Sequence, residues 1–176
     1  MRAFLDAESI GEHMEYLRGL KLRYSILEKS IDGIRGKSVG DIMKMKLSRG
    51  EREDIMRLLP EIRLHEIFFN SFSGNRFVNS ELVREGFGSE GAFLNELYRL
   101  CMRTEYGFVS VCVRGREIYL VGGGEYPRHF QSAEPILCID LCEHAYFSDY
   151  RFCKDEYLQR ALMYFDISRL DFDEKH

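Results

Sequence analysis

The first part of the chain carries apolar residues at helical spacing. From Ser9 onward they recur at steps of three and four, at Ile10, Met14, Leu17, Leu20, Tyr24, Leu27 and Ile31. This spacing predicts one long amphipathic helix, because residues three and four apart share a helix face. The glycines of IDGIRGKSVG then favour backbone shapes through which a helix does not continue.

A second long helix is predicted to begin near residue 48. Ser48 and Glu51 have the spacing of a capping box, in which each side chain bonds the backbone N–H of the other residue. The helix should run towards LHEIFFNSFSG, with Pro60 kinking or interrupting it. With a short helical piece in VGDIMKMK between the two, residues 1–80 are interpreted as an N-terminal helical hairpin domain.

The pattern changes in the second half of the chain. A helix is expected to begin near Ser89, and FVSVCVRGREIYLVGGG predicts two strands joined by a turn at Arg114-Gly115. ILCID is typical of a short buried strand, and KDEYLQRALMYFD returns to helical spacing. Residues 81–176 are therefore predicted to form a C-terminal α/β domain with a small antiparallel sheet of about three strands. The fold class is α+β.

Composition and charge narrow the function classes. Hydrophobic residues make up 45% of the chain and charged residues 31%, which is typical of a soluble globular protein. The formal net charge of −4 and the lack of a long apolar run argue against nucleic-acid and membrane partners. Five cysteines without a C-x-x-C pair indicate reduced thiols, and hence a cytoplasmic protein.

Several ionisable residues stand in apolar surroundings and are candidates for chemistry. In ILCIDLCEHAY, Asp140 ends a buried strand and Glu143 and His144 follow it closely. Carboxylate and imidazole are good ligands for iron, manganese or zinc. Alternatively, Asp140 caps the next helix while Glu143 and His144 face solvent or a subunit contact. His65 leaves the same choice open between a metal ligand and a hydrogen-bonded core histidine.

The order of these segments resembles the iron/manganese superoxide dismutase family. DLCEHAY at 140–146 is similar to that family's D-x-W-E-H-A-Y signature, and LHEIFFNS at 64–71 resembles its N-H-x-F-(F/Y)-W-N segment. EHMEYLRGLKLRYSIL at 12–27 resembles the first-helix pattern E-x-x-x-Y-H-x-x-H-H-x-x-Y, and FGS and EYGF at 87–89 and 105–108 fit two further stretches. The likeness covers roughly residues 8–170.

The resemblance implies a ligand set for one iron or manganese ion per chain. The family binds its metal through three histidines, one aspartate and a solvent ligand, and His65, Asp140 and His144 match three of these positions. The histidine of the first helix falls on Leu17, and leucine does not coordinate a metal. The chain therefore needs another fourth ligand if the site is complete.

Three residues are candidates for that fourth ligand. Glu61 is placed first, because it precedes His65 by four residues and stands where iron members of the family hold a glutamine. His13 is placed second, since it lies one helical turn before Leu17, although an exposed histidine in the first turn is the ordinary interpretation. Cys142 is placed last, because its position within D-x-x-x-H should point it away from the site.

Other positions depart from the family pattern. The gating histidine and tyrosine of the first helix fall on Lys21 and Ser25, with Tyr24 adjacent. The chain contains no tryptophan: Phe69, Phe108 and Cys142 stand where three of the family's tryptophans near the metal would be. Phe147 replaces the tyrosine that would reach across the dimer.

The resemblance suggests dismutation of superoxide to dioxygen and hydrogen peroxide, with Tyr24 or Lys21 guiding the anion. It also implies a homodimer through the region of Glu143 and His144, where Glu143 would pair with the metal histidine of the other subunit. The alternative is an impaired or inactive relative with a weak or empty metal site, and a third hypothesis is a different non-haem metal activity. Whether the protein is an enzyme is left open.

Overall fold

A computed structural model describes residues 4–73 and 79–175. Its α-helices are α1 (Ala7–Ser30), α2 (Val39–Lys44), α3 (Arg49–Asn70), α4 (Glu81–Phe87), α5 (Glu90–Arg103), α6 (Glu143–Tyr150) and α7 (Lys154–Met163). The strands are β1 (Phe108–Arg114), β2 (Glu117–Gly123) and β3 (Pro135–Asp140), and two 3₁₀ helices are η1 (Tyr126–Phe130) and η2 (Ile167–Lys175).

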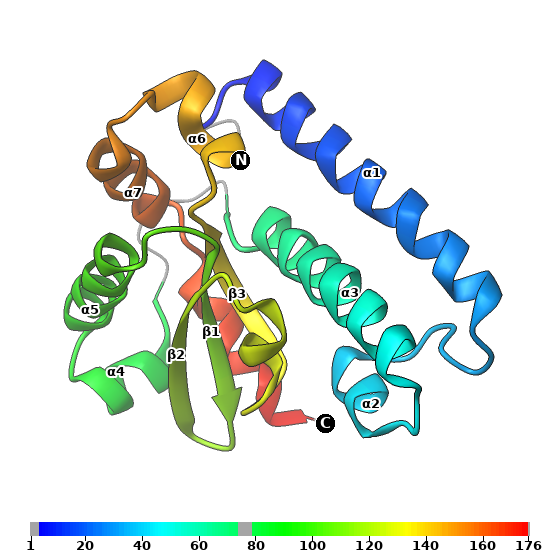
Figure 1. The fold of residues 1–176 in the computed structure, drawn as a ribbon. Helices are drawn as coiled ribbons and strands as arrows, with labels where there is room; N and C mark the ends of the chain where they lie inside the picture. Colours follow the sequence, from blue (N-terminus) through cyan, green and yellow to red (C-terminus); the bar gives the residue numbers. More distant parts are fainter. Residues whose placement is uncertain (1–3, 74–78, 176) are drawn as a thin grey trace.

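The helices α1 and α3 form an antiparallel pair (Figure 1). Asp6 caps α1, because its side chain accepts a hydrogen bond of 2.8 Å from the backbone N–H of Ser9. At the start of α3, Ser48 and Glu51 form the capping box that their spacing predicts. These caps set where each helix begins, and therefore which residues face the rest of the protein.

Pro60 does not interrupt α3, so the break that the sequence allowed there is absent. The helix runs from Arg49 to Asn70 and is continuous in Figure 1. A proline inside a helix removes one backbone hydrogen bond. Pro60 is buried between Leu59 and Glu61, so packing on this face offsets the missing bond and holds the helix together.

The sheet has three antiparallel strands in the order β2-β1-β3, which confirms the α+β fold class predicted from the sequence. The central strand β1 pairs Phe108 with Gly123 of β2 on one side and with Asp140 of β3 on the other. Asp140 therefore lies at the end of an edge strand, where its pairing with Phe108 of the central strand fixes its backbone position.

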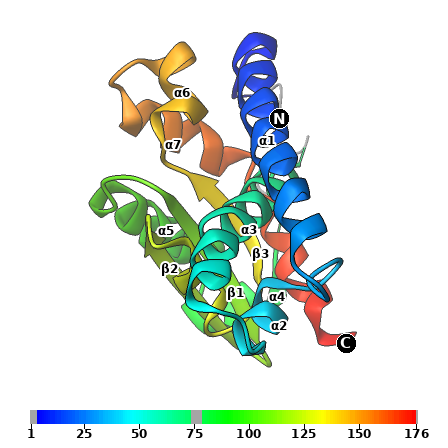
Figure 2. The ribbon, with the colours of Figure 1, turned by 45° about the vertical axis from the view of Figure 1, so that its right-hand side comes forward.

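The elements are arranged in layers, with α3 between α1 and the sheet (Figure 2). On the side facing α3, α1 buries Ser9, His13, Leu17 and Leu20. Met14 was expected on this face from the apolar spacing, but 56% of it is exposed. Each helical residue turns by about 100°, so Met14 points outward when its neighbour His13 points inward.

No helix among the described residues combines the length and the apolar character that a membrane span requires. The longest, α1, carries exposed charged residues along its outer face, including Glu15 and Arg18.

A buried serine ties the end of α3 to the strand that ends in Asp140. The Ser71 hydroxyl accepts a hydrogen bond of 2.8 Å from the Cys138 backbone N–H and donates one of 2.7 Å to the Ile67 carbonyl. Ser71 is fully buried, so water cannot replace these partners. The contact fixes the position of β3 relative to α3.

We expect Ser71→Ala to lower the free energy of unfolding by about 1–3 kcal/mol, because it leaves the buried Cys138 N–H without an acceptor. The matched control is Ser30→Ala, since Ser30 is exposed at the end of α1 and should change the value by less than about 0.5 kcal/mol. Urea denaturation followed by circular dichroism measures both. Equal effects of the two changes would contradict the role assigned to Ser71.

A second buried polar group, His129, joins η1 to the sheet. The Gly123 carbonyl only accepts, so His129 Nε2 carries the proton and donates to it at 3.0 Å, while the Ser110 hydroxyl donates to Nδ1 at 2.7 Å. Burial lowers the pKa of His129, although the Gly123 carbonyl acts in the opposite direction. The folded protein therefore favours the neutral imidazole.

This network gives an acid-dependent loss of stability. A histidine whose pKa is lower in the folded state stabilises the fold above its unfolded pKa of about 6.5, and this contribution disappears as the pH falls below that value. We expect the unfolding free energy to fall between pH 7 and pH 5 by up to about 1.4 kcal/mol per pH unit from this group. His129→Gln should lose less stability over the same interval in urea titrations. Parallel pH profiles of the two proteins would refute the assignment.

Candidate metal centre

Asp140 presents a carboxylate in the interior of the protein. Its side chain is fully buried, Oδ1 accepts a 2.8 Å hydrogen bond from the Cys142 N–H, and its backbone carbonyl accepts a 2.9 Å bond from the Tyr157 hydroxyl. These contacts hold the end of β3 and leave Oδ2 pointing towards the helices. Oδ2 has no hydrogen-bond partner among the described residues.

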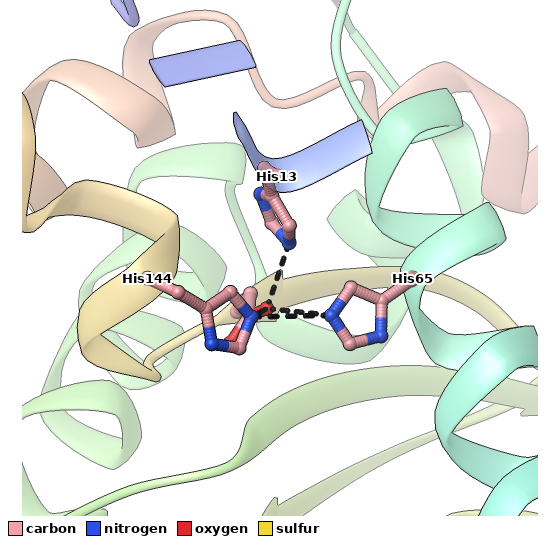
Figure 3. Close-up of side chains that lie close together, drawn as sticks. His13, His65 and His144 are labelled. Atoms are coloured by element: carbon pink, nitrogen blue, oxygen red, sulfur yellow. Dashed lines mark hydrogen bonds and ion pairs between the residues drawn. The ribbon is translucent and has the colours of Figure 1, made fainter. Parts of the chain in front are cut away.

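Three histidines from three different helices surround this oxygen. His13 comes from α1, His65 from α3 and His144 from α6, and their rings converge on one point (Figure 3). The Nε2 atoms of His13, His65 and His144 lie 3.2, 3.4 and 3.2 Å from Asp140 Oδ2. The ligand-capable atoms of the four residues all lie within 4.8 Å of one another.

The arrangement fits a metal ion. Metal bonds to nitrogen and oxygen of about 2.0–2.2 Å place neighbouring ligand atoms roughly 3.0–3.5 Å apart, and the three separations from Asp140 Oδ2 fall in this range. The Nε2 of His13 is also buried without a hydrogen-bond partner among the described residues. A buried carboxylate oxygen with three imidazole nitrogens around it is an arrangement that a cation bound between them would stabilise.

The electrostatics of the cluster favour an ionised aspartate. Burial on its own would raise the pKa of Asp140, but the surrounding imidazoles outweigh it and hold that pKa far below its ordinary value. Burial lowers the pKa of His65 to about 4 despite the nearby Asp140 carboxylate. At neutral pH the cluster therefore offers an anionic oxygen together with a neutral His65 imidazole, the states in which both groups bind metals.

His65 and His144 differ in their surroundings. His65 is fully buried, and its Nδ1 donates a 2.8 Å hydrogen bond to the Glu61 carbonyl, which leaves the Nε2 lone pair directed at the cluster. The side chain of His144 is 31% exposed and forms the open side of the cluster. Burial would lower the pKa of His144, but the adjacent Asp140 carboxylate raises it.

A tyrosine and a glutamate lie next to the cluster without joining it. The Tyr16 ring stacks on the His144 ring with centroids 4.4 Å apart, and the Tyr16 hydroxyl donates a 2.7 Å hydrogen bond to Glu61 Oε1. Burial and this hydrogen bond raise the pKa of Tyr16, while burial raises the pKa of Glu61. The raised pKa of Tyr16 means that the phenol keeps its proton at neutral pH.

The structure brings His65, Asp140 and His144 together, as the sequence pattern suggested, and adds His13 rather than Glu61. The sequence pattern places Glu61 before His13 as the candidate fourth ligand, but in the structure it is His13 that lies in the cluster. His13 is 1% exposed and lies on the same helix face as Leu17, one turn earlier, so the histidine of the cluster stands one turn before the position that the family pattern predicts. Leu17 instead packs in an apolar cluster with Leu20, Leu58 and Ile62.

Other residues singled out from the sequence lie away from the cluster. Lys21 follows His13 by eight residues, about 12 Å along the helix, and its ammonium pairs with Glu66 at 2.7 Å. Tyr24 is one turn farther and lines a cavity of about 550 Å³ with Lys21. Glu143 is exposed beside His144. Tyr16 was not among the residues predicted from the sequence. It follows His13 by three residues and so shares its helix face, which was the signal that could have placed it beside the cluster.

Cys142 does not contribute to the cluster of donor atoms. Its sulfur is directed at the Gly107 carbonyl, 3.9 Å away, while its backbone N–H bonds Asp140. This placement agrees with the reasoning that put it last among the candidate ligands.

The fold and the cluster define an α+β protein with a candidate mononuclear metal centre. A family model described as "Iron/manganese superoxide dismutases, C-terminal domain" matches residues 78–171, more than half of the chain. The chain belongs to the iron/manganese superoxide dismutase family, and this membership implies a metal cofactor. A search of curated proteins finds no match to the chain.

The choice between His13 and Glu61 as the fourth ligand can be tested directly. We expect protein purified with iron or manganese to hold about one ion per chain. His13→Ala should lose most of this metal and Glu61→Gln should retain it, because His13, unlike Glu61, directs a donor atom at Asp140 Oδ2. Elemental analysis measures the metal content, and circular dichroism checks folding. Loss of metal from Glu61→Gln with retention in His13→Ala would reverse the assignment.

Proposed function

We propose that the protein binds one iron or manganese ion through His13, His65, Asp140 and His144 and catalyses the dismutation of superoxide. The observation that carries this proposal is the convergence of three imidazole Nε2 atoms on the buried Oδ2 of Asp140. Family membership supports the same chemistry. The bound ion would supply the electron exchange that oxidises one superoxide to dioxygen and reduces a second to hydrogen peroxide.

The protein residues set the charge of the site. Histidine ligands bind a metal as neutral imidazoles, so the four ligands contribute the single negative charge of Asp140, and a divalent or trivalent ion would leave the complete site positive and attractive to an anion. Asp140 is held by the Cys142 N–H and His65 by the Glu61 carbonyl, and these bonds orient both side chains before any ion arrives. Two of the four proposed ligands, Asp140 and His65, are therefore held in orientation by hydrogen bonds within the protein.

Peroxide formation consumes two protons, and the Tyr16 hydroxyl is the proton-bearing group beside the cluster. It lies over the His144 ring on the open side, and 38% of Tyr16 is exposed. The Tyr16 hydroxyl donates a hydrogen bond to Glu61 Oε1 at 2.7 Å, and this bond also fixes the phenol in place. We assign to Tyr16 the delivery of a proton and to Glu61 the orientation of Tyr16.

Lys21 and Tyr24 retain a more distant role in this proposal. Their side chains line the cavity between α1 and α3, so they act on an approaching anion through charge at a distance and not by contact with the ion. The pairing of Lys21 with Glu66 weakens that effect.

We further propose a homodimer formed around Glu143 and His144. The support is that His144, a ligand, is 31% exposed in a single chain, and that Glu143 beside it is exposed and free to reach a second subunit. The five cysteines are free thiols, which supports function in the reducing cytoplasm.

A second candidate function is metal binding without turnover. Glu61 places a carboxylate where iron members of the family hold a neutral amide, and negative charge there opposes the approach of superoxide. In this second candidate function the four residues still bind the metal, and only the turnover of superoxide is lost.

We expect metal-loaded wild-type protein to consume superoxide and Tyr16→Phe to lower the rate about tenfold or more, because the phenol proton is removed while the four ligands remain. Tyr106→Phe is the matched control, since Tyr106 is 63% exposed and not at the cluster. Stopped-flow superoxide decay, scaled to metal content, measures all three proteins. Full metal content without superoxide decay in the wild type would refute dismutation and favour the second candidate.

A further inference from the structure

The ligand from the first helix lacks a partner for its second ring nitrogen. A histidine that binds a metal through Nε2 normally donates its Nδ1–H to an acceptor, which fixes the ring and its proton. His65 does so through the Glu61 carbonyl. His13 Nδ1 is buried and has no hydrogen-bond partner among the described residues. An acceptor is therefore missing at this position.

Ser9 supplies an unpaired oxygen on the same face of α1. Its hydroxyl is buried, with 2% of the residue exposed, and has no hydrogen-bond partner among the described residues either. Ser9 precedes His13 by four residues, a spacing that puts their Cβ atoms roughly 5–6 Å apart. Helical side chains lean towards the N-terminus, so the His13 ring lies over the turn that carries Ser9.

Two carboxylates lie on the other side of Ser9. The Ser9 N–H donates to Asp6 Oδ1 at 2.8 Å, and the Asp6 N–H donates to Asp149 Oδ2 at 3.0 Å. The carboxylates of Asp6 and Asp149 thus flank the Ser9 hydroxyl, which does not yet have the geometry of a hydrogen bond to either. A hydroxyl donates one proton and accepts at two lone pairs, so Ser9 can accept a hydrogen bond from His13 and donate one to a carboxylate at the same time.

We propose that Ser9 is a positioning residue for the metal ligand His13. The Ser9 hydroxyl accepts the His13 Nδ1–H, either directly after rotation of the serine side chain or through one buried water, and donates its own proton to the Asp6 or Asp149 carboxylate. This chain of hydrogen bonds holds the His13 proton on Nδ1 and leaves the Nε2 lone pair facing Asp140. The inference rests on the proposed metal site and names a residue that acts on it from outside the ligand set.

The first test measures metal affinity with cobalt(II) as the probe. Metal-free wild type, Ser9→Ala, Ser9→Thr and Ser25→Ala are titrated with cobalt(II) in competition with a chelator, and the visible absorption of the bound ion is recorded. We expect Ser9→Ala to bind about tenfold more weakly and with an altered spectrum, because His13 loses its orientation. Ser9→Thr keeps the hydroxyl and should remain closer to wild type. Ser25→Ala is the control on the same helix, since Ser25 bonds the Leu22 carbonyl.

The second test needs no metal. Ser9→Ala is made in the wild-type chain and in a His13→Phe chain, where the ring is kept between Phe68 and Phe69 but has no nitrogen. Thermal unfolding of the metal-free proteins is followed by circular dichroism. We expect Ser9→Ala to lower the Tm of the wild-type chain by several degrees and to have less effect when residue 13 is Phe, because the pair is already absent.

The outcomes separate this inference from the proposed function. Unchanged cobalt affinity and spectrum in Ser9→Ala would overturn the role of Ser9, as would equal Tm losses in the two chains. Absence of cobalt binding by the wild type would count against the metal site itself, and the thermal cycle would then still decide whether Ser9 and His13 are coupled.

Discussion

The rest of this structure depends on a carboxylate that is buried at the end of a strand. Burial alone would neutralise Asp140, yet the imidazoles around Oδ2 hold its pKa far below the ordinary value. The sheet supplies the position, since Asp140 pairs with Phe108 on the central strand, and the Cys142 N–H occupies Oδ1. Only Oδ2 is left for chemistry, and three neighbouring helices, α1, α3 and α6, each direct a histidine at it.

This convergence links the helical and the sheet-containing parts of the chain. α1, α3 and α6 contribute one histidine each, so the geometry of the cluster requires that α3 packs on β3 and that α1 packs on both α3 and α6. Ser71 fixes α3 to β3, and the caps of α1 and α3 set the rotational position of His13 and His65. The buried Oδ2 and the facing Nε2 of His13 lie 3.2 Å apart, and the negative charge of this buried carboxylate is what a cation at the candidate site would complement.

Sequence reasoning predicted the fold class and three of the clustered residues, because these depend on local pattern. The turn signal at Arg114-Gly115 and the buried run ILCID predicted the antiparallel sheet, and the motif at 140–146 with His65 indicated three residues of the candidate site. The pattern did not locate the fourth, since matching the first helix to a family motif placed it at Leu17. A shift of one helical turn preserves the face, so periodicity does not distinguish Leu17 from His13. Pro60 shows the same limit, because packing and not local propensity decided that α3 continues.

The most direct test of the central claim is X-ray absorption spectroscopy of the protein loaded with one equivalent of iron or manganese. The account predicts a first shell of nitrogen and oxygen atoms at about 2.0–2.2 Å, with outer-shell scattering that fits three imidazoles and no sulfur. A shell with two or fewer imidazoles, or with a sulfur ligand, would contradict the assignment of His13, His65, Asp140 and His144 as the metal centre.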